Sequence, residues 1–162
     1  VFSYPALEEQ QYVVAEARVG FPYVPGLLAF REGPAALTAL DRLTAPWDVL
    51  LCDGHGYAHP RRLGLASHLG VLLGVRSVGC AKSRLIGRHD PVAEEPGSRA
   101  ELLADGEVVG AVLRTRRGAR PVYVSVGHAI GLESAIDLVL ACTRNHRLPE
   151  PARRAHALAS RR

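Results

Sequence analysis

Residues 47–56 read Trp-Asp-Val-Leu-Leu-Cys-Asp-Gly-His-Gly, an apolar run that ends in an aspartate followed by glycines. Successive apolar side chains are typical of a strand that is covered on both faces of a sheet. The glycines end such a strand and allow the backbone to approach a ligand closely. The stretch therefore predicts a buried strand with a carboxylate, Asp53, at its carboxyl end.

The next two segments extend this strand into a βαβ unit. Residues 63–74 carry apolar side chains at helical spacing, and residues 75–81 form a second apolar run. Open α/β sheets place their ligand sites at the carboxyl ends of the strands. Asp53 is therefore expected at a functional site.

The remaining patterns predict further strands and helices around this unit. Residues 87–100 combine prolines, a glycine and alternating charge, which indicates a surface loop. The other expected elements are strands over 2–5 and 11–18, a helix over 34–43, a hairpin of 107–115 with 121–126, and a helix over 132–143. This order favours one α/β domain over residues 1–162, with a mixed sheet in a three-layer fold.

Composition limits the classes of protein to which the chain can belong. The net charge is +4 and the pI is about 9.3, values that fit a polyanionic partner but also an ordinary solvated basic face. No apolar run approaches the roughly 20 residues that span a bilayer, so no membrane partner is expected. Three cysteines without metal-ligand spacing predict reduced thiols and a cytoplasmic location. We expect a monomer.

The histidines after Asp53 raise the question of a zinc site. His55 and His59 lie four residues apart, but neither a glutamate-bearing helical motif nor a thiolate accompanies them. Zinc is therefore not expected. A carboxylate that leaves a buried strand into a glycine-rich, basic turn instead suits metal-assisted phosphate chemistry.

Five blocks of the sequence resemble signatures of the endonuclease V family. They are residues 21–34, 53–70, 78–83, 123–128 and 147–151, in the family's order and over nearly the whole chain. The resemblance implies a ribonuclease H-like fold and a Mg²⁺-dependent DNA-repair nuclease, with Mn²⁺ as an alternative ion. It also implies a substrate, DNA that contains deoxyinosine or, in some members, inosine in RNA. The cut implied is at the second phosphodiester bond 3′ to the hypoxanthine.

The resemblance assigns catalytic roles to four residues. Asp53 and Glu32 match metal-binding carboxylates, Lys82 a cation beside them, and His156 a histidine that positions water or assists proton movement. Each has a plainer interpretation: a helix cap for Asp53, a first-turn helix acid for Glu32, a neutralising salt bridge for Lys82, and a surface position for His156.

The resemblance also assigns residues to the nucleic acid. The turn around Tyr23 resembles a rigid wedge that enters the duplex beside the lesion, although a core tyrosine in a tight turn is the alternative. The nucleic-acid contacts expected are Tyr23, Pro22, Val24, Pro25, His59, Arg61, Arg62 and Arg84. The expected pocket for the flipped base consists of Gly26, Leu28, Gly54 and Leu85.

One departure from the family pattern concerns the start of the chain. Family members begin with a strand that carries another metal-binding aspartate, and no residue before Phe2 supplies it. We therefore expect a missing first strand, poor cleavage by the 162-residue chain, and an exposed sheet edge. Two other functional classes stay open: a module that binds inosine without cutting it, and a nucleotide-binding α/β protein, for which Gly54-His55-Gly56 lacks a third glycine.

Overall fold

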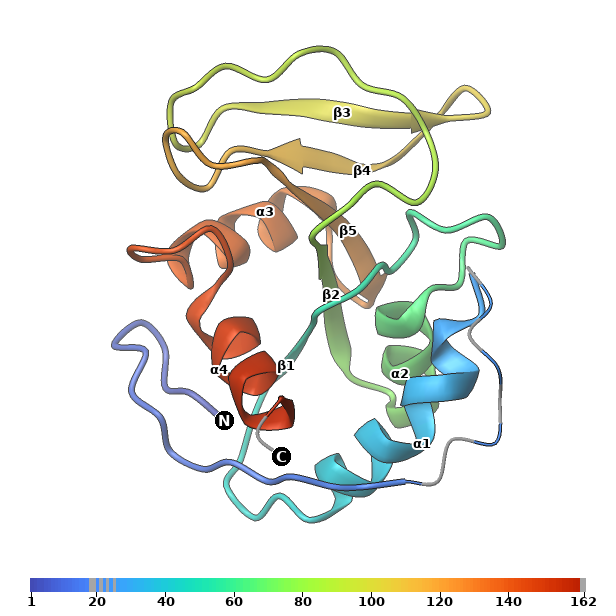
Figure 1. The fold of residues 1–162 in the computed structure, drawn as a ribbon, viewed down its shortest axis with the longest axis vertical. Coiled ribbons are helices and arrows are strands. Elements are labelled where there is room, and N and C mark those ends of the chain that lie inside the picture. The colour runs from blue at the N-terminus through green and yellow to red at the C-terminus, as the bar shows by residue number, and fades with distance from the viewer. Residues whose placement is uncertain (18–19, 21, 23, 25, 161–162) are drawn as a thin grey trace.

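The computed structural model describes residues 1–17, 20, 22, 24 and 26–160 of the chain. Figure 1 shows a central sheet with helices on either side of it. In chain order the elements are α1 (Leu28–Asp41), β1 (Val49–Cys52), α2 (Leu65–Leu73), β2 (Arg76–Ala81), β3 (Arg99–Ala104), β4 (Glu107–Leu113), β5 (Val122–His128), α3 (Leu132–Ala141) and α4 (Glu150–Ala159).

The five strands form one mixed sheet in the order β1-β2-β5-β4-β3. β1 and β2 run parallel, with Cys52 opposite Gly79, and α2 connects them as the predicted crossover. β5 pairs antiparallel with both β2 and β4, and β4 pairs antiparallel with β3. The predictions of a βαβ unit, of the 107–126 hairpin and of a mixed sheet are confirmed.

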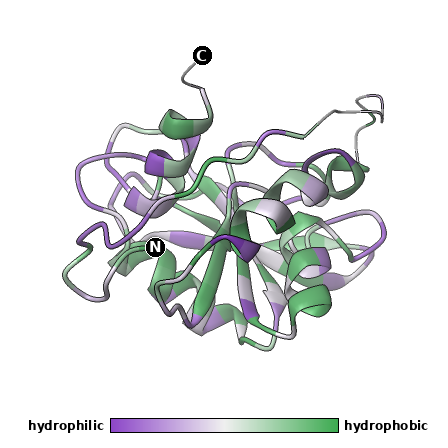
Figure 2. Ribbon diagram, turned by 90° about the horizontal axis from the view of Figure 1, so that it is seen from below, coloured by the Kyte–Doolittle hydropathy of each residue, from purple (hydrophilic) through white to green (hydrophobic). Residues whose placement is uncertain are grey.

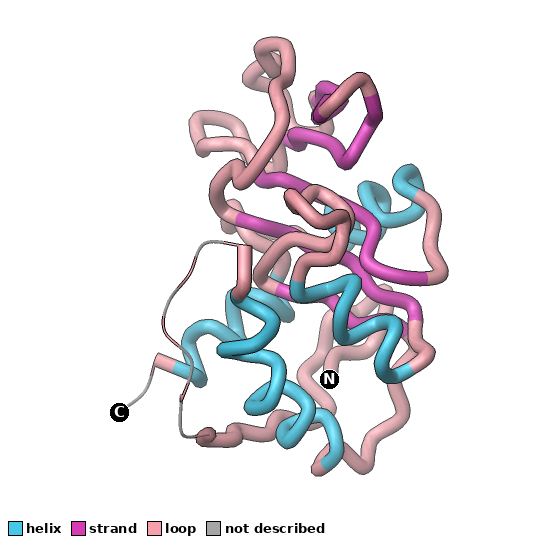
Figure 3. Tube along the Cα trace, turned by 90° about the vertical axis from the view of Figure 1, so that its right-hand side faces the viewer, coloured by secondary structure: helices cyan, strands magenta, loops and turns pink. Residues whose placement is uncertain are grey.

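Both faces of the sheet are covered, which gives the three predicted layers. On one face, Ile136 and Val139 of α3 pack against buried valines of β2 and β5. On the other face, Leu65 and Leu69 of α2 pack on β1, and α1 packs outside α2. Figure 2 shows largely hydrophobic strands at the centre, and Figure 3 shows α1 and α2 from the side on which they lie. The carboxyl ends of the parallel strands β1 and β2 are thus left uncovered between helices that belong to different layers.

Helix α1 begins at Leu28, whereas the sequence predicted a start at about Pro34. A proline normally disfavours helical backbone at the residue before it because its ring crowds that residue's Cβ. Here that residue is Gly33, which has no Cβ, so the helix continues through Pro34 with the loss of one backbone hydrogen bond. The predicted start was wrong, and Glu32 consequently lies in the second turn of α1.

Strand β3 was not predicted, and its first residues overlap the loop expected over 87–100. Asp105 and Gly106, which join β3 to β4, both have positive φ, of 55° and 79°. Two positive φ values in succession define the tight hairpin turn for which Asp-Gly is a strong sequence signal. That dipeptide could have identified the hairpin.

The two strands predicted near the N-terminus, over 2–5 and 11–18, are not found in the described part of the chain. Phe2 and Glu9 make an isolated bridge, and residues 11–17 have no regular structure. The Val1 amine instead donates to the carbonyl of Gln11. A strand forms only where a neighbour pairs with its backbone groups, and an alternating apolar pattern cannot show whether one is present.

Close backbone contact at Gly56 gives the first testable prediction. A Cβ at Gly56 would lie 2.1 Å from the Val126 carbonyl oxygen of β5, whereas a Cβ at Gly131 would meet no atom within 4 Å. Gly56→Ala is expected to destabilise the fold by about 3 kcal/mol, and Gly131→Ala by less than about 0.5 kcal/mol. Thermal unfolding measures both, and equal melting temperatures for the two variants would contradict the close approach.

Candidate active site

The centre of the site is an ion pair between the ends of two parallel strands. Asp53 follows β1 and Lys82 follows β2, and parallel strands in register bring their carboxyl ends to the same edge. Lys82 Nζ donates to Asp53 Oδ2 at 2.6 Å, and both side chains are about one third exposed. The contact places an ammonium and a carboxylate at the surface, where a phosphate could reach both.

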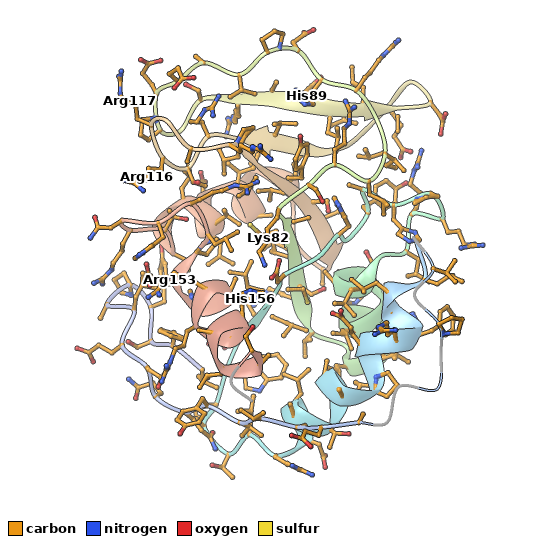
Figure 4. The ribbon with its side chains drawn as sticks, in the orientation of Figure 1. Lys82, His89, Arg116, Arg117, Arg153 and His156 are labelled. Carbon is orange, nitrogen blue, oxygen red and sulfur yellow. The ribbon has the colours of Figure 1, made fainter. Side chains whose placement is uncertain are left out.

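Helix α4 brings a histidine to this pair. His156 Nδ1 lies 3.5 Å from Lys82 Nζ and 3.9 Å from Asp53 Oδ2, and the imidazole is 60% exposed. Figure 4 shows Lys82 and His156 projecting toward one another from different elements. The three residues are far apart in the sequence but form one cluster at the open edge.

Glu32 completes the set of charges. The residue is exposed, but the protein around its carboxyl partly desolvates it, which raises the pKa of the carboxyl, as does the negative charge of Asp53. The cations Arg31 and Lys82 act in the opposite direction. Glu32 is therefore close enough to Asp53 for the negative charge of Asp53 to disfavour ionisation of Glu32.

The fit of this set to a divalent ion depends on its donors. In the described part of the chain, no three histidines, cysteines or acids gather in a metal-binding arrangement. Two acids are nevertheless close, and Mg²⁺ is usually held by one or two carboxylates together with waters and substrate phosphates. The pKa of Glu32 is raised first by desolvation and second by the negative charge of Asp53, and a bound cation would offset the second effect. The donor set therefore fits Mg²⁺ better than zinc.

A cavity of about 580 Å³ opens beside the charged cluster. Asp53 and Lys82 lie on its wall, which is otherwise mostly apolar. The four residues predicted for the base pocket all line it: Gly26, Leu28, Gly54 and Leu85. A single cavity thus adjoins the carboxylates and has the size of a small-molecule site.

His59 has a different environment from the one that the sequence predicted. The ring is 5% exposed, its Nδ1 accepts the backbone N–H of Arg61 and its Nε2 donates to the Gly26 carbonyl at 2.8 Å. Burial lowers its pKa, so the ring is neutral. Both nitrogens are engaged in joining the strand-end loop to the turn before α1, and a phosphate would have to displace one of these bonds.

The predicted arginine contacts separate into two groups. Arg61 and Arg84 are exposed and line the cavity. Arg62 instead forms ion pairs with Asp105 and Glu107 and lies over the Tyr57 ring. Its charge is balanced within the protein, which disfavours the predicted contact between Arg62 and nucleic acid.

The predicted wedge is only partly within the described residues. Tyr23 and Pro25 lie outside them. Pro22 and Val24 are described and exposed, and Val24 lines the cavity. The wedge therefore stays a prediction, and of its described residues Val24 lies at the cavity.

Two supporting residues were not assigned a role from the sequence. The guanidinium of Arg147 donates to the Lys82 carbonyl and, at 2.8 Å, to that of Pro121. His55 lines the cavity and hydrogen-bonds the Ser83 carbonyl at 3.0 Å, and burial lowers its pKa. These contacts fix the backbone at Lys82 and at the residue that follows it. Both residues belong to the motif blocks, but sequence does not show which carbonyl a side chain reaches.

Comparison with known proteins gives matches over nearly the whole chain. The family model described as Endonuclease V matches residues 1–157. A protein named endonuclease V from Roseiflexus castenholzii is 56% identical over 160 residues, which are 99% of this chain and 72% of that protein. One from Trichormus variabilis is 55% identical over 162 residues, 100% of this chain and 73% of that protein.

Solved structures agree with these matches. Endonuclease V from Streptomyces avermitilis superposes with a TM-score of 0.82 and 52% sequence identity. The superposed part is 87% of this chain and 62% of that protein. Human ENDOV superposes with a TM-score of 0.84 and 38% sequence identity, over 98% of this chain and 73% of that protein. A third structure is Ciona intestinalis endonuclease V in complex with a 23mer DNA containing an inosine followed by a ribo-adenosine. It superposes with a TM-score of 0.85 and 31% sequence identity, over 98% of this chain and 73% of that protein. The fold is ribonuclease H-like, as predicted.

Proposed function

The chain belongs to the endonuclease V family, and we propose that it is a metal-dependent endonuclease acting on strands that contain hypoxanthine. The cut proposed is at the second phosphodiester bond 3′ to the lesion. One observation carries the proposal: Asp53, Lys82 and His156 meet, with Glu32 in electrostatic reach, beside a cavity large enough for a nucleobase. The Ciona intestinalis relative, solved with inosine-containing DNA, supports the substrate class.

Asp53 and Glu32 are the residues that would hold Mg²⁺, or Mn²⁺ in its place. Bound there, the ion would neutralise charge on the phosphate and make a water more acidic. The protein's own contribution is to present two carboxylates, one at a strand end and one on a helix, whose mutual repulsion a bound cation would relieve. Asp53 is also held in place by Lys82.

Lys82 and His156 act on the phosphate and on protons. The Lys82 ammonium has three donors, of which one is used by Asp53 and a second faces His156 at 3.5 Å, so the third can bind a phosphate oxygen. His156 is exposed and close to both charged groups. It is placed to position a water at the phosphate or to take up a proton, as general acid–base residues do.

The cavity would accept the base after it leaves the stack. Enzymes that act at a damaged base commonly extrude it into a fitted pocket. Gly26 and Gly54 line this cavity without side chains, which allows a base to approach the backbone closely. Hypoxanthine presents an oxygen acceptor where adenine presents an amine, so a backbone N–H there would favour hypoxanthine.

The proposed partner and location are supported by the composition and by the state of the cysteines. We propose deoxyinosine-containing DNA as the substrate, with inosine-containing RNA as the alternative, for a monomer in the cytoplasm. Cys52, Cys80 and Cys142 are all unpaired and buried, which supports a reducing compartment. Among the described residues, no helix has the length and apolar character to cross a membrane.

Cleavage of matched oligonucleotides tests the proposal. Strands that differ only in inosine or adenosine at one position are incubated with Mg²⁺, with Mn²⁺ or with a chelator, and product lengths are measured. Any product, however low its yield from the 162-residue chain, is expected from the inosine strand alone, cut one nucleotide beyond the lesion and only with a divalent ion. Inosine-selective binding without product would favour the binding module, and affinity for free nucleotides without affinity for oligonucleotides would favour the nucleotide-binding class.

A further inference from the structure

An arginine-rich turn joins β4 to β5. It spans residues 114–121 and carries Arg114, Arg116, Arg117 and Arg120. Such a cluster on a basic protein can be an ordinary solvated face. The place of the turn in the sheet and the partners of its arginines indicate a more specific role.

The turn lies at the same edge of the sheet as the charged cluster. β5 is antiparallel to β2, with Tyr123 opposite Ala81, and β4 is antiparallel to β5. The carboxyl ends of β2 and β4 and the start of β5 are therefore at one edge, where Lys82 follows β2. Neighbouring strands are about 4.8 Å apart, so the turn begins only one or two strand spacings from the end of β2. A nucleic acid strand that is bound at Lys82 can reach the turn by running along this edge.

Hydrogen bonds fix the turn to the protein beneath it and to the site. The Arg114 side chain is 11% exposed and donates to two carbonyls of the loop before β3, both at 3.1 Å, and to one carbonyl of the turn itself. Buried Thr115 donates to the Arg147 carbonyl at 2.6 Å. One guanidinium nitrogen of Arg147 donates in turn to the carbonyls of Lys82 and Pro121. The turn is thus ordered before a ligand binds, which lowers the entropic cost of binding.

The four arginines differ in their partners. Arg114 and Arg117 each form an ion pair with a glutamate of the loop before β3, at 3.9 Å and 2.9 Å. Arg116 and Arg120 are exposed, and within the part of the chain that the structure describes their guanidinium groups make no hydrogen bond, ion pair or ring contact. Figure 4 shows Arg116 projecting outward at the edge of the molecule. The nearby acids are therefore balanced by the other two arginines, and the positive charges of Arg116 and Arg120 stay available to a ligand.

We propose that Arg116 and Arg120 bind phosphates of the substrate strand outside the cavity, and so hold its backbone along this edge of the sheet. The inference rests on the proposed function, in which a nucleic acid strand is cut at the charged cluster. A guanidinium can bind a phosphate through two parallel hydrogen bonds. Neither arginine lines the cavity, so both contact the backbone and not the flipped base. Backbone contacts position a strand without reading its sequence.

The salt dependence of binding tests the role of the turn, because each phosphate contact releases condensed counterions. Affinity for a single-stranded inosine oligonucleotide is measured in chelator over a series of salt concentrations. Arg116→Ala and Arg120→Ala are each expected to weaken binding and to reduce the slope of log affinity against log salt by about 0.7, and the double variant by about 1.4. Arg116→Lys, which keeps the charge, should retain the slope of the unsubstituted protein.

Arg76→Ala is the matched control. Arg76 is an exposed arginine at the first position of β2, so it lies at the opposite edge of the sheet, about 20 Å along the strand from Lys82. Its removal changes the net charge equally and should leave the slope unchanged. If the double variant of Arg116 and Arg120 has the same slope as Arg76→Ala, the turn does not bind phosphates.

Neutral methylphosphonate linkages, placed one at a time along the strand, locate the contacts. At the linkage that Arg116 binds, the replacement should weaken binding by the unsubstituted protein and have almost no further effect on Arg116→Ala. Losses that add at every linkage would also overturn the contact.

The preference for inosine over adenosine separates this inference from the proposed function. Because backbone contacts carry no sequence information, the preference should be the same in every arginine variant. A preference for inosine together with unchanged salt slopes overturns the role of the turn alone. Equal affinity of the unsubstituted protein for inosine and adenosine strands overturns the proposed function and with it the substrate assigned to the turn.

Discussion

Asp53→Asn is expected to slow cleavage of an inosine-containing strand at least about 100-fold relative to the unsubstituted protein. The substitution keeps the volume of the side chain and removes the charge that faces both Lys82 and Glu32. Loss of an outer partner of a metal ligand already costs about 10–100-fold, so loss of the ligand's own charge should cost more. Single-turnover cleavage with Mg²⁺ measures the rate, and affinity for the inosine strand without metal should be largely retained.

The control for this variant is Asp48→Asn. Asp48 is an exposed aspartate that precedes β1, at the end of the strand away from the site. Its removal changes the net charge equally and should leave the cleavage rate unchanged. If Asp53→Asn instead lost inosine binding while its Mg²⁺-dependent rate per bound complex persisted, the carboxylate would be structural and not a metal ligand.

The parts of the fold that were predicted correctly are those in which local pattern and burial agree. β1, α2 and β2 have apolar runs of the right length, and Gly74 ends α2 in the left-handed conformation that favours glycine. The start of α1 was missed because the effect of Pro34 depends on the residue before it, and glycine removes the clash. The N-terminal strands were wrong because pairing depends on a neighbour that a local pattern does not specify.

The charged residues of the site could be predicted from the sequence, whereas most of their contacts could not. Asp53 and Lys82 follow adjacent parallel strands, so topology alone brings them together. His156 could be placed only through the family resemblance, since its distance to Lys82 depends on how α4 packs. The partners of Arg62 and His59 could not be predicted, because Asp105, Glu107 and the Gly26 carbonyl reach them through loops whose course no periodicity describes.

Glu32→Gln is expected to have two opposite effects, on stability and on cleavage. Partial desolvation and the negative charge of Asp53 raise the pKa of Glu32 above its ordinary value of 4.5, so the folded protein binds this proton more tightly than the unfolded chain. The contribution of Glu32 to stability is therefore present below about pH 4.5 and is lost as the pH rises through the raised pKa. Glutamine cannot ionise, so at neutral pH in a chelator the variant should be the more stable by a few degrees at most, since solvent screens an exposed carboxyl.

With divalent ions, the unsubstituted protein should instead be more stable than Glu32→Gln. Mg²⁺ or Mn²⁺ binds the ionised carboxylates of the unsubstituted protein and stabilises its folded state, whereas Glu32→Gln lacks one of the two charges and should gain much less. Its cleavage rate should fall about 100-fold or more for the same reason. The measurements are melting temperatures from pH 4 to 8 with chelator and with metal, and single-turnover rates. Equal stabilisation of both proteins by the ion would show that Glu32 does not help to bind it, and a lower melting temperature for Glu32→Gln in chelator at neutral pH would contradict the raised pKa.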